Sequence, residues 1–352
     1  ILITGATDGI GDGGDVGVEQ RGDRDARPRI VGADGAAWVT DGGRDEIQRV
    51  DAETGTVERF PIGRTGANLN TAAFGGDGAL WFTQANAHAI GRITTTGQIT
   101  DFPLPTADAR PLAITVGPDG ALWFVQQLDS SYGFGRITTS GVVSEVPYDE
   151  LSAQPGQMTG GPLGSVWATS GRDHLIEILP NGHVNELFMH GFHTTGDITV
   201  GPDGNLWFTS QANDRVGRIT PGGTISTWTH VDLDRPDSIV AGPDGNLWIT
   251  NRQNDTVAKV TTAGVITVFA DPEDEVDTPA AIVAGPDGNL WFTSFSNDRV
   301  ARLSTSGVIT TFTGSGLNGP AGITVGPDGA LWIASDYADE VVRMTTAGAV
   351  TN

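Results

Sequence analysis

Eight copies of one short phrase recur along the chain at a nearly constant spacing. The clearest copies, residues 201–209 and 285–293, both read Gly-Pro-Asp-Gly-Asn-Leu-Trp-Phe-Thr. The tryptophans that anchor the copies lie 40 to 44 residues apart, at Trp38, Trp81, Trp123, Trp167, Trp207, Trp248, Trp291 and Trp332. A period near forty that is built from strand-like segments is typical of a β-propeller with one blade per copy.

Each copy is predicted to form a meander of four short antiparallel strands. In the copy that spans residues 195–231, we expect strands at 197–200, 206–209, 216–220 and 224–228, separated by turns rich in Gly, Pro, Asn and Asp. Eight copies favour eight blades, with seven as the alternative if one copy is irregular or lies outside the ring. We therefore predict an all-β protein with one propeller domain at 27–352 and a partly flexible N-terminal extension at 1–26.

Two side chains that recur in the copies are predicted to be structural. Each Trp is expected to pack in the core between blades. A basic residue recurs in the predicted third strand, which lies away from the ring axis, so we expect it to pack there or to pair with acids of a neighbouring blade rather than to bind anions. These basic residues are Arg49, Arg92, Arg136, Arg218, Lys259, Arg302 and Arg343.

The composition narrows the classes of partner. The chain carries 43 acidic and 20 basic residues, for a net charge of -23, and such a surface repels nucleic acid and anionic membranes. The chain has no Cys, which excludes disulfides and Cys-bound metals. No apolar run is long enough to span a membrane. We expect a monomeric acidic bacterial protein with a small-molecule ligand, extracellular in preference to cytoplasmic, as a mature form whose leader has been removed.

A ligand of such a ring is expected near the axis, where the loops between blades meet the loops that join second and third strands. Two positions in each copy are predicted to point there, one eleven residues before the Trp and one three residues after it. Their distinctive side chains are Asn70, Asp237, Asp41, Gln84, Gln126 and Asn251. Asp237 and Asn251 are candidate ligands of a divalent cation, Mg²⁺ or Ca²⁺, since such ions take carboxylate and amide oxygens; a water-filled channel is the alternative.

Four further candidates follow from the loops of the same face. His190 and His193 lie in the loop before the fifth blade, where either imidazole could act as a general base or bind a metal together with Asp197. A solvated polar loop is the alternative. Arg235 could reach an anionic group of a ligand, or pair with a nearby acid, Asp232 or Asp234. His88 and His174 are predicted to be turn residues.

The N-terminal segment resembles the cofactor motif of short-chain dehydrogenases. It reads Thr-Gly-Ala-Thr-Asp-Gly-Ile-Gly at residues 4–11. That motif needs a following helix whose N-terminus holds a pyrophosphate, and the chain continues Asp-Gly-Gly-Asp instead. The Tyr-x-x-x-Lys pair of those enzymes is also absent, so we expect no nucleotide cofactor.

The full repeat resembles that of virginiamycin B lyases. The shared pattern is Pro-x-x-Ile-Thr-x-Gly-Pro-Asp-Gly-x-Leu-Trp-Phe-Thr, followed by Gly-Arg-Ile-Thr and Thr-x-Gly-x-Ile-Thr-x-Phe. The resemblance implies a propeller, usually of seven blades, that linearises streptogramin B antibiotics by magnesium-dependent elimination. In that family the catalytic blades read Glu-Pro-His-Gly-Ile-Thr, with His as the base, and Trp-Phe-Thr-Glu, with Glu holding the metal.

The catalytic residues of that pattern are not matched in this chain. The corresponding Pro-x-x-Ile segments contain no His; they are residues 111–114, 236–239, 279–282 and 320–323. No Trp-Phe-Thr run is followed by Glu. We therefore expect no streptogramin-opening activity and favour a propeller that binds a small polar or cationic ligand on the axial loop face. The alternative is a metal-dependent lyase or a lactonase-like hydrolase that uses the axial residues and the 190–197 loop.

Overall fold

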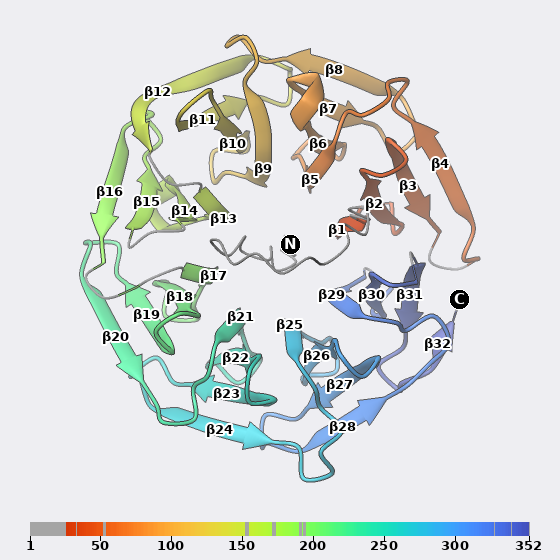
Figure 1. Cartoon of the computed structure of the whole chain (residues 1–352), viewed down its shortest axis with the longest axis vertical. Coiled ribbons are helices and arrows are strands. Elements are labelled where there is room, and N and C mark those ends of the chain that lie inside the picture. Colours follow the sequence, from red (N-terminus) through yellow and green to blue (C-terminus); the bar gives the residue numbers. More distant parts are fainter. Residues whose placement is uncertain are drawn as a thin grey trace, which may run out of the picture.

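The chain forms a closed ring of eight four-stranded antiparallel sheets around one axis (Figure 1). The computed structural model describes residues 26–32, 34–51, 54–151, 155–170, 174–189, 192, 195–326, 328–338 and 340–351. Each sheet consists of four strands that follow one another in the sequence. The prediction of an all-β propeller with eight blades is therefore confirmed. Of the extension predicted at 1–26, only Ala26 is described, as the start of the first strand.

The strands of each blade run from the axis to the rim in sequence order (Figure 1). Blades 1 to 4 comprise β1 (Ala26–Val31), β2 (Ala37–Asp41), β3 (Glu46–Val50), β4 (Val57–Pro61); β5 (Leu69–Phe74), β6 (Leu80–Gln84), β7 (Ala89–Ile93), β8 (Ile99–Pro103); β9 (Arg110–Val116), β10 (Leu122–Gln127), β11 (Tyr132–Ile137), β12 (Val143–Leu151); and β13 (Pro155–Gly160), β14 (Val166–Ser170), β15 (His174–Ile178), β16 (Val184–Phe188).

Blades 5 to 8 comprise β17 (Thr195–Val200), β18 (Leu206–Ser210), β19 (Arg215–Ile219), β20 (Ile225–Thr229); β21 (Pro236–Ala241), β22 (Leu247–Asn251), β23 (Thr256–Val260), β24 (Ile266–Ala270); β25 (Pro279–Ala284), β26 (Leu290–Ser294), β27 (Arg299–Leu303), β28 (Ile309–Phe312); and β29 (Pro320–Val325), β30 (Leu331–Ser335), β31 (Glu340–Met344), β32 (Val350–Thr351). Two short 3-10 turns, η1 (Ala85–Ala87) and η2 (Pro162–Gly164), interrupt the pattern.

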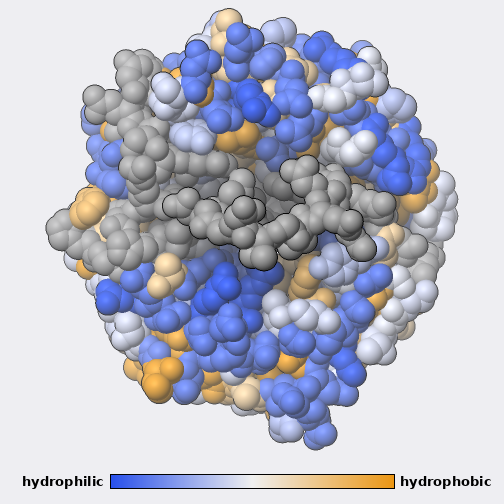
Figure 2. All heavy atoms as spheres, viewed as in Figure 1, coloured by the Kyte–Doolittle hydropathy of each residue, from blue (hydrophilic) through white to orange (hydrophobic). Residues whose placement is uncertain are grey.

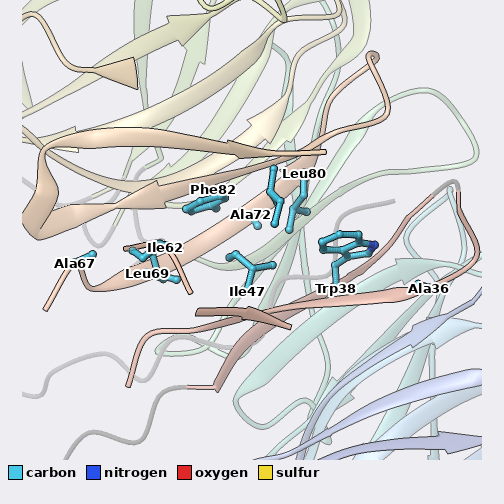
Figure 3. Close-up of a cluster of buried hydrophobic side chains, with 10 residues drawn as sticks. Ala36, Trp38, Ile47, Ile62, Ala67, Leu69, Ala72, Leu80 and Phe82 are labelled. Carbon is cyan, nitrogen blue, oxygen red and sulfur yellow. The ribbon is translucent and has the colours of Figure 1, made fainter. Parts of the chain in front are cut away.

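Apolar side chains of adjacent blades form the core. Between blades 1 and 2, Trp38 and Ile47 pack with Leu80 and Phe82 (Figure 3). All eight repeat tryptophans are buried, which confirms their predicted role in the core. The ring closes in the same way, because Trp332 of blade 8 packs against Ala37 and Val50 of blade 1. Burial of this apolar area between every pair of blades is the main force that holds the ring together.

In several blades, the aspartate of the turn before the second strand contacts the third-strand Arg, and in most of these also the Trp, of its own blade. In blade 5, Trp207 Nε1 donates to Asp203 Oδ1 at 3.0 Å, and Arg218 Nη1 lies 3.6 Å from Asp203 Oδ2. Trp207 and Arg218 are partners in the strand register, so the guanidinium also lies over the indole ring, 5.6 Å from its centroid. Corresponding Asp–Arg ion pairs join Asp34 to Arg49, Asp77 to Arg92, Asp119 to Arg136 and Asp328 to Arg343.

The expected pairing of these arginines with acids of a neighbouring blade is therefore wrong. The turn aspartate precedes the Trp by four residues, and the Arg faces the Trp across the strand register, so all three side chains meet within one blade. Arg218 does reach the next blade, but there it donates to the carbonyl of Thr262 at 2.9 Å. The repeated basic residue thus has a structural role, as the sequence indicated.

We expect these turns to make the protein sensitive to acid. Burial alone would raise the pKa of Asp287, but hydrogen bonds from Asn289 and Trp291 outweigh it and hold that pKa below its usual value. A carboxyl whose pKa is lowered by folding stabilises the protein above its unfolded pKa, and this stability is lost as the pH falls through the folded pKa. Urea unfolding between pH 5 and pH 2 should therefore show falling stability over the acid end of that range.

Asp287→Asn tests the origin of this acid sensitivity. The variant should lose about 1–3 kcal/mol of stability at pH 7, since a charge-assisted hydrogen bond to the indole is weakened. It should also lose part of the acid dependence. A variant with the same acid dependence as the wild type would show that the turn carboxylates are not its source.

The described residues contain no helix of the length and apolarity needed to cross a membrane. In Figure 2, hydrophilic residues predominate over the described part of the visible face, and apolar residues are scattered among them.

Candidate functional site

In blades 2, 4, 5, 6 and 7, a threonine two residues after the Trp accepts a hydrogen bond from an amide near the start of the inner strand. In blade 5, Thr209 Oγ1 accepts from the amide of Asp197 at 2.9 Å and donates to the carbonyl of Asp237 in blade 6 at 2.8 Å. Equivalent threonines donate to the next blade at Leu112, Ala280 and Ala321. The Thr of the Trp-Phe-Thr phrase therefore joins neighbouring inner strands, and it places the residues nearest the axis.

The amide side chains three residues after the Trp are buried and have separate hydrogen-bond partners. Gln84 Nε2 donates to Asp101 Oδ1 on the rim strand β8 at 2.7 Å, and Gln126 Nε2 lies 3.4 Å from Glu145 Oε1 on the rim strand β12. Asn251 Nδ2 donates to Thr256 Oγ1 of its own blade at 3.0 Å. Each amide nitrogen therefore has a partner within its own blade, and the role of these side chains in ligand binding stays a prediction.

Asp41 of blade 1 and Asn70 of blade 2 were also predicted to bind the ligand. Asp41 Oδ2 accepts from Arg44 Nη1 at 2.8 Å and from Gln48 Nε2 at 3.1 Å. Asn70 is partly buried at the start of β5. The role of Asp41 and Asn70 in ligand binding stays a prediction.

Two other predicted residues do come together, where the inner strands of blades 5 and 6 meet. Asp197 Oδ2 accepts from Ser238 Oγ and from the amide of Ile239, both at 3.1 Å. Asp237 Oδ1 accepts from Gln211 Nε2 of blade 5 at 2.6 Å, and Arg252 Nη1 of blade 6 lies 3.7 Å from Asp237 Oδ2. We call Asp197, Gln211, Asp237, Ser238 and Arg252 the seam cluster.

The carboxyl of Asp197 has a raised pKa. Burial raises its pKa to about 6, hydrogen bonds from Ile239, Ile198 and Ser238 oppose that rise, and the negative charge of Asp237 adds to it. A carboxyl with this pKa can exchange a proton under physiological conditions, as general acids and bases do. Its contacts also resemble those of Thr71, whose Oγ1 accepts from the amide of Ile114 in the next blade at 2.9 Å.

Sequence reasoning missed Gln211 and Arg252. Both stand four residues after the Trp of their blade, one position beyond the residues that were singled out. The available signal was that an acid, Asp237, stands where the other copies of blades 2 to 8 have uncharged residues, so it needs donors close by.

Arg235 lies on the loop that enters blade 6 and is exposed. Its amide donates to Asp214 Oδ1 at 2.8 Å, and its backbone is left-handed, with φ at 48°. Asp255 and Asp298 hold the next two linkers in the same way, through the amides of Thr278 and Gly319. No ion pair between Arg235 and Asp232 or Asp234 is found in the described part of the chain, and Asp232 lies 3.6 Å from His230 instead.

The histidines separate into two groups. His88 has φ at 54°, and its Nδ1 lies 3.2 Å from the carbonyl of Ala109, so it is a turn residue at the position that Asp214 occupies in blade 5. The prediction of a turn residue is wrong for His174, which begins β15 and packs edge-on against Phe188 with 5.0 Å between the ring centroids. His190 and His193 lie outside the described residues, so their catalytic role stays a prediction.

A cation at Asp237 and Asn251 also stays a prediction. Asp237 accepts from Gln211 while Asn251 donates to Thr256, so the two side chains have different partners. Within the described ranges, no three side chains of the types His, Cys, Asp and Glu form a group that could hold a metal.

A model of the virginiamycin B lyase family matches residues 22–195 and 191–352. This chain belongs to the virginiamycin B lyase family. No curated protein matches. Among solved structures, a streptogramin B lyase is 28% identical with a TM-score of 0.64, covering 79% of this chain and 94% of that one. The virginiamycin B lyase from Staphylococcus aureus is 31% identical with a TM-score of 0.64, covering 78% of this chain and 94% of that one.

This member of the virginiamycin B lyase family departs from the catalytic pattern at defined places. The four Pro-x-x-Ile segments lie in the inner strands β9, β21, β25 and β29, which surround the axis (Figure 1). The residue after each proline is Leu112, Asp237, Ala280 or Ala321. Of these, Asp237 alone carries a charge, and it belongs to the seam cluster.

Proposed function

We propose that this protein is a small-molecule-binding propeller that does not open streptogramin B antibiotics. Its site is the axial loop face at the seam cluster. The observation that carries this proposal is the seam cluster itself, where the lyase pattern calls for His and the chain has Asp237, hydrogen-bonded to Gln211 and close to Arg252.

The chemistry of the cluster suits ligand orientation. A carboxylate, an amide and a guanidinium offer acceptors and donors within one small region, and such a mixture fixes the orientation of a polar ligand. Asp197 and Thr209 hold the two inner strands together beneath it, so the polar groups are set in place before a ligand arrives.

A solved relative supports the absence of lyase chemistry. That structure is a catalytically inactive variant of the Staphylococcus aureus virginiamycin B lyase, in which an alanine replaces a histidine, with quinupristin; it is 27% identical, with a TM-score of 0.59, and covers 92% of this chain and 95% of that one. Loss of one imidazole is thus enough to inactivate that protein. The four Pro-x-x-Ile segments of this chain have no His at all.

The proposal predicts that the purified protein leaves streptogramin B intact in the presence of Mg²⁺. Ring opening is followed by mass spectrometry, with the Staphylococcus aureus enzyme as the positive control. Magnesium-dependent opening by this chain above the buffer rate would refute the proposed function.

A binding arm tests the location of the site. A set of small polar compounds is screened by ligand-observed NMR against the wild type, Asp237→Asn and the control Glu58→Gln, whose side chain is exposed on the rim strand β4. Compounds that bind at the seam cluster should lose affinity with Asp237→Asn alone. Equal binding to all three proteins would move the site elsewhere.

The alternative is a metal-dependent lyase or a lactonase-like hydrolase, in which Asp197 exchanges a proton. The observation that favours it is the pKa of about 6 for this carboxyl. The opening assay is extended to a panel of lactones with and without EDTA. Turnover that disappears in Asp197→Asn would support this alternative, and no turnover of any lactone would count against it.

A further inference from the structure

In blade 6, two arginines face each other at the open end of the hairpin formed by β21 and β22, opposite its turn. Pro236 and Asn251 are partners in the strand register, and one step further the amide of Arg252 donates to the carbonyl of Arg235 at 3.2 Å. The same backbone hydrogen bond joins Ala85 to Asn68, Phe295 to Thr278 and Asp336 to Gly319 in other blades. None of those three pairs contains a cation, and in blade 3 Arg110 faces Gln127, so among these described positions two arginines face each other in blade 6 alone.

The two guanidinium groups differ in their surroundings. Arg252 Nη1 lies 3.7 Å from Asp237 Oδ2, and 24% of its side chain remains exposed. Arg235 is exposed, and no ion pair to its guanidinium is found in the part of the chain that the structure describes, although the chain has 43 acidic residues. The nearby carboxylate of Asp214 is engaged by the backbone amide of Arg235.

Like charges on facing residues repel each other, and Asp237 offsets the charge of Arg252 alone. The backbone of Arg235 is fixed by three constraints. These are the hydrogen bond from its amide to Asp214, the hydrogen bond from the amide of Arg252 to its carbonyl, and the ring of Pro236. Its left-handed backbone, at φ 48°, is an uncommon conformation for a residue other than glycine. An anion between the two side chains would turn repulsion into attraction.

We propose that Arg235 and Arg252 together bind a carboxylate group of a small organic acid at the axial end of blade 6. A guanidinium presents two parallel N–H donors that match the two oxygens of a carboxylate, which favours this anion over a single halide. Gln211 holds Asp237, and Asp237 faces Arg252, so one guanidinium is oriented by the protein while the other is free to close on the ligand. This inference rests on the proposed binding function and names its ligand class.

Succinate is the probe, titrated into the full chain by isothermal calorimetry, with inorganic phosphate in a parallel arm. The wild type should bind succinate saturably. Arg235→Ala and Arg252→Ala should each weaken binding at least about tenfold, since each removes charge-assisted hydrogen bonds. The matched control is Arg59→Ala, whose side chain is 51% exposed on the rim strand β4 and pairs with Glu46. Arg59→Ala should bind succinate as the wild type does.

Arg235→Ala keeps the test decisive if Arg252→Ala fails to fold. The side chain of Arg235 is exposed and its structural contacts run through the backbone, so Arg235→Ala should unfold at the wild-type urea concentration. Unchanged succinate binding by this variant, or no saturable binding by the wild type, would overturn the inference. Equal affinity for phosphate and succinate would overturn the assignment to carboxylates.

The failure of this inference can be told from failure of the proposed function. Loss of a different polar ligand in Asp237→Asn but not in Arg235→Ala leaves the binding function in place and removes the carboxylate assignment. Opening of streptogramin B removes the proposed function whatever succinate does.

Discussion

Gly217→Ile is expected to destabilise the protein by about 3 kcal/mol or more, and Phe208→Ala in the same chain is expected to recover much of that loss. Gly217 is the register partner of Phe208, and a Cβ at Gly217 would lie 2.3 Å from two ring carbons of Phe208. Phe208 is fully buried and cannot move aside. The glycine therefore makes room for the ring.

In blades 2, 3 and 4, a large side chain at one of these two positions faces a small residue at the other. Phe82 faces Gly91 and Phe124 faces Gly135, whereas in blade 4 the pair is reversed in size, with Ala168 facing Ile176. Both members of that blade 4 pair are fully buried. Phe208→Ala with Gly217→Ile copies the blade 4 arrangement into blade 5.

A double-mutant cycle measured by urea unfolding tests this account. Each single variant should lose several kcal/mol, about 3–5 for Phe208→Ala because a buried ring leaves a cavity. The double variant should be more stable than the sum of the two losses predicts. Gly222→Ile is the control, because this exposed turn glycine has no atom nearer than 3.9 Å to its added Cβ. Additive losses would mean that the two positions do not share one space.

The ring itself could be predicted from the sequence because every essential contact occurs repeatedly. Trp207, its turn aspartate and its register partner Arg218 recur at one spacing, so their joint role stands out from chance. The direction of the amides was harder to predict. Because side chains alternate along a strand, Gln84 lies on the same sheet face as Phe82, between two blades. Its side chain can reach Asp101 because Gly91 has no side chain in that space.

The seam cluster depends on contacts that a single repeat does not contain. Asp197 and Ser238 stand at the same position of consecutive copies, 41 residues apart, and their hydrogen bond crosses from one blade to the next. The repeat period could have predicted that neighbourhood. The length and direction of the Gln211 and Arg252 side chains decide which donors reach Asp237. Their directions follow from packing between blades rather than from the repeat pattern of the sequence.

Asp197→Thr is expected to remove a pH dependence of stability that the wild type shows between about pH 4 and pH 7. The folded pKa of Asp197 is about 6, against an ordinary value of 3.8, so in this interval the folded state binds more protons than the unfolded state. The contribution is fully present below the unfolded pKa, and it is lost as the pH rises through the folded pKa. Wild-type stability should thus increase on acidification from pH 7 to pH 4.

The expected size of this effect is about 1–3 kcal/mol, which allows for the remaining solvent exposure of Asp197. This interval lies above the acid range in which the turn aspartates lose their contribution, so the two effects oppose each other in separate windows. Relief of the net charge of -23 also favours folding on acidification. A variant that differs from the wild type at Asp197 alone is therefore needed to separate the contribution of this carboxyl to the pH dependence of stability.

Asp197→Thr is the matched variant because blade 2 already uses that side chain at the equivalent place. Thr71 Oγ1 accepts from the amide of Ile114 and donates to the carbonyl of Leu112 at 3.1 Å, so a threonine keeps the connection between blades without a titrating group. Urea unfolding at half-unit steps of pH gives the difference in free energy of unfolding between wild type and variant. That difference should change over the interval from pH 4 to pH 7 and level off above it. Parallel curves for the two proteins would mean that the Asp197 carboxyl keeps an ordinary pKa in the folded ring, and that its three hydrogen bonds fully offset its burial.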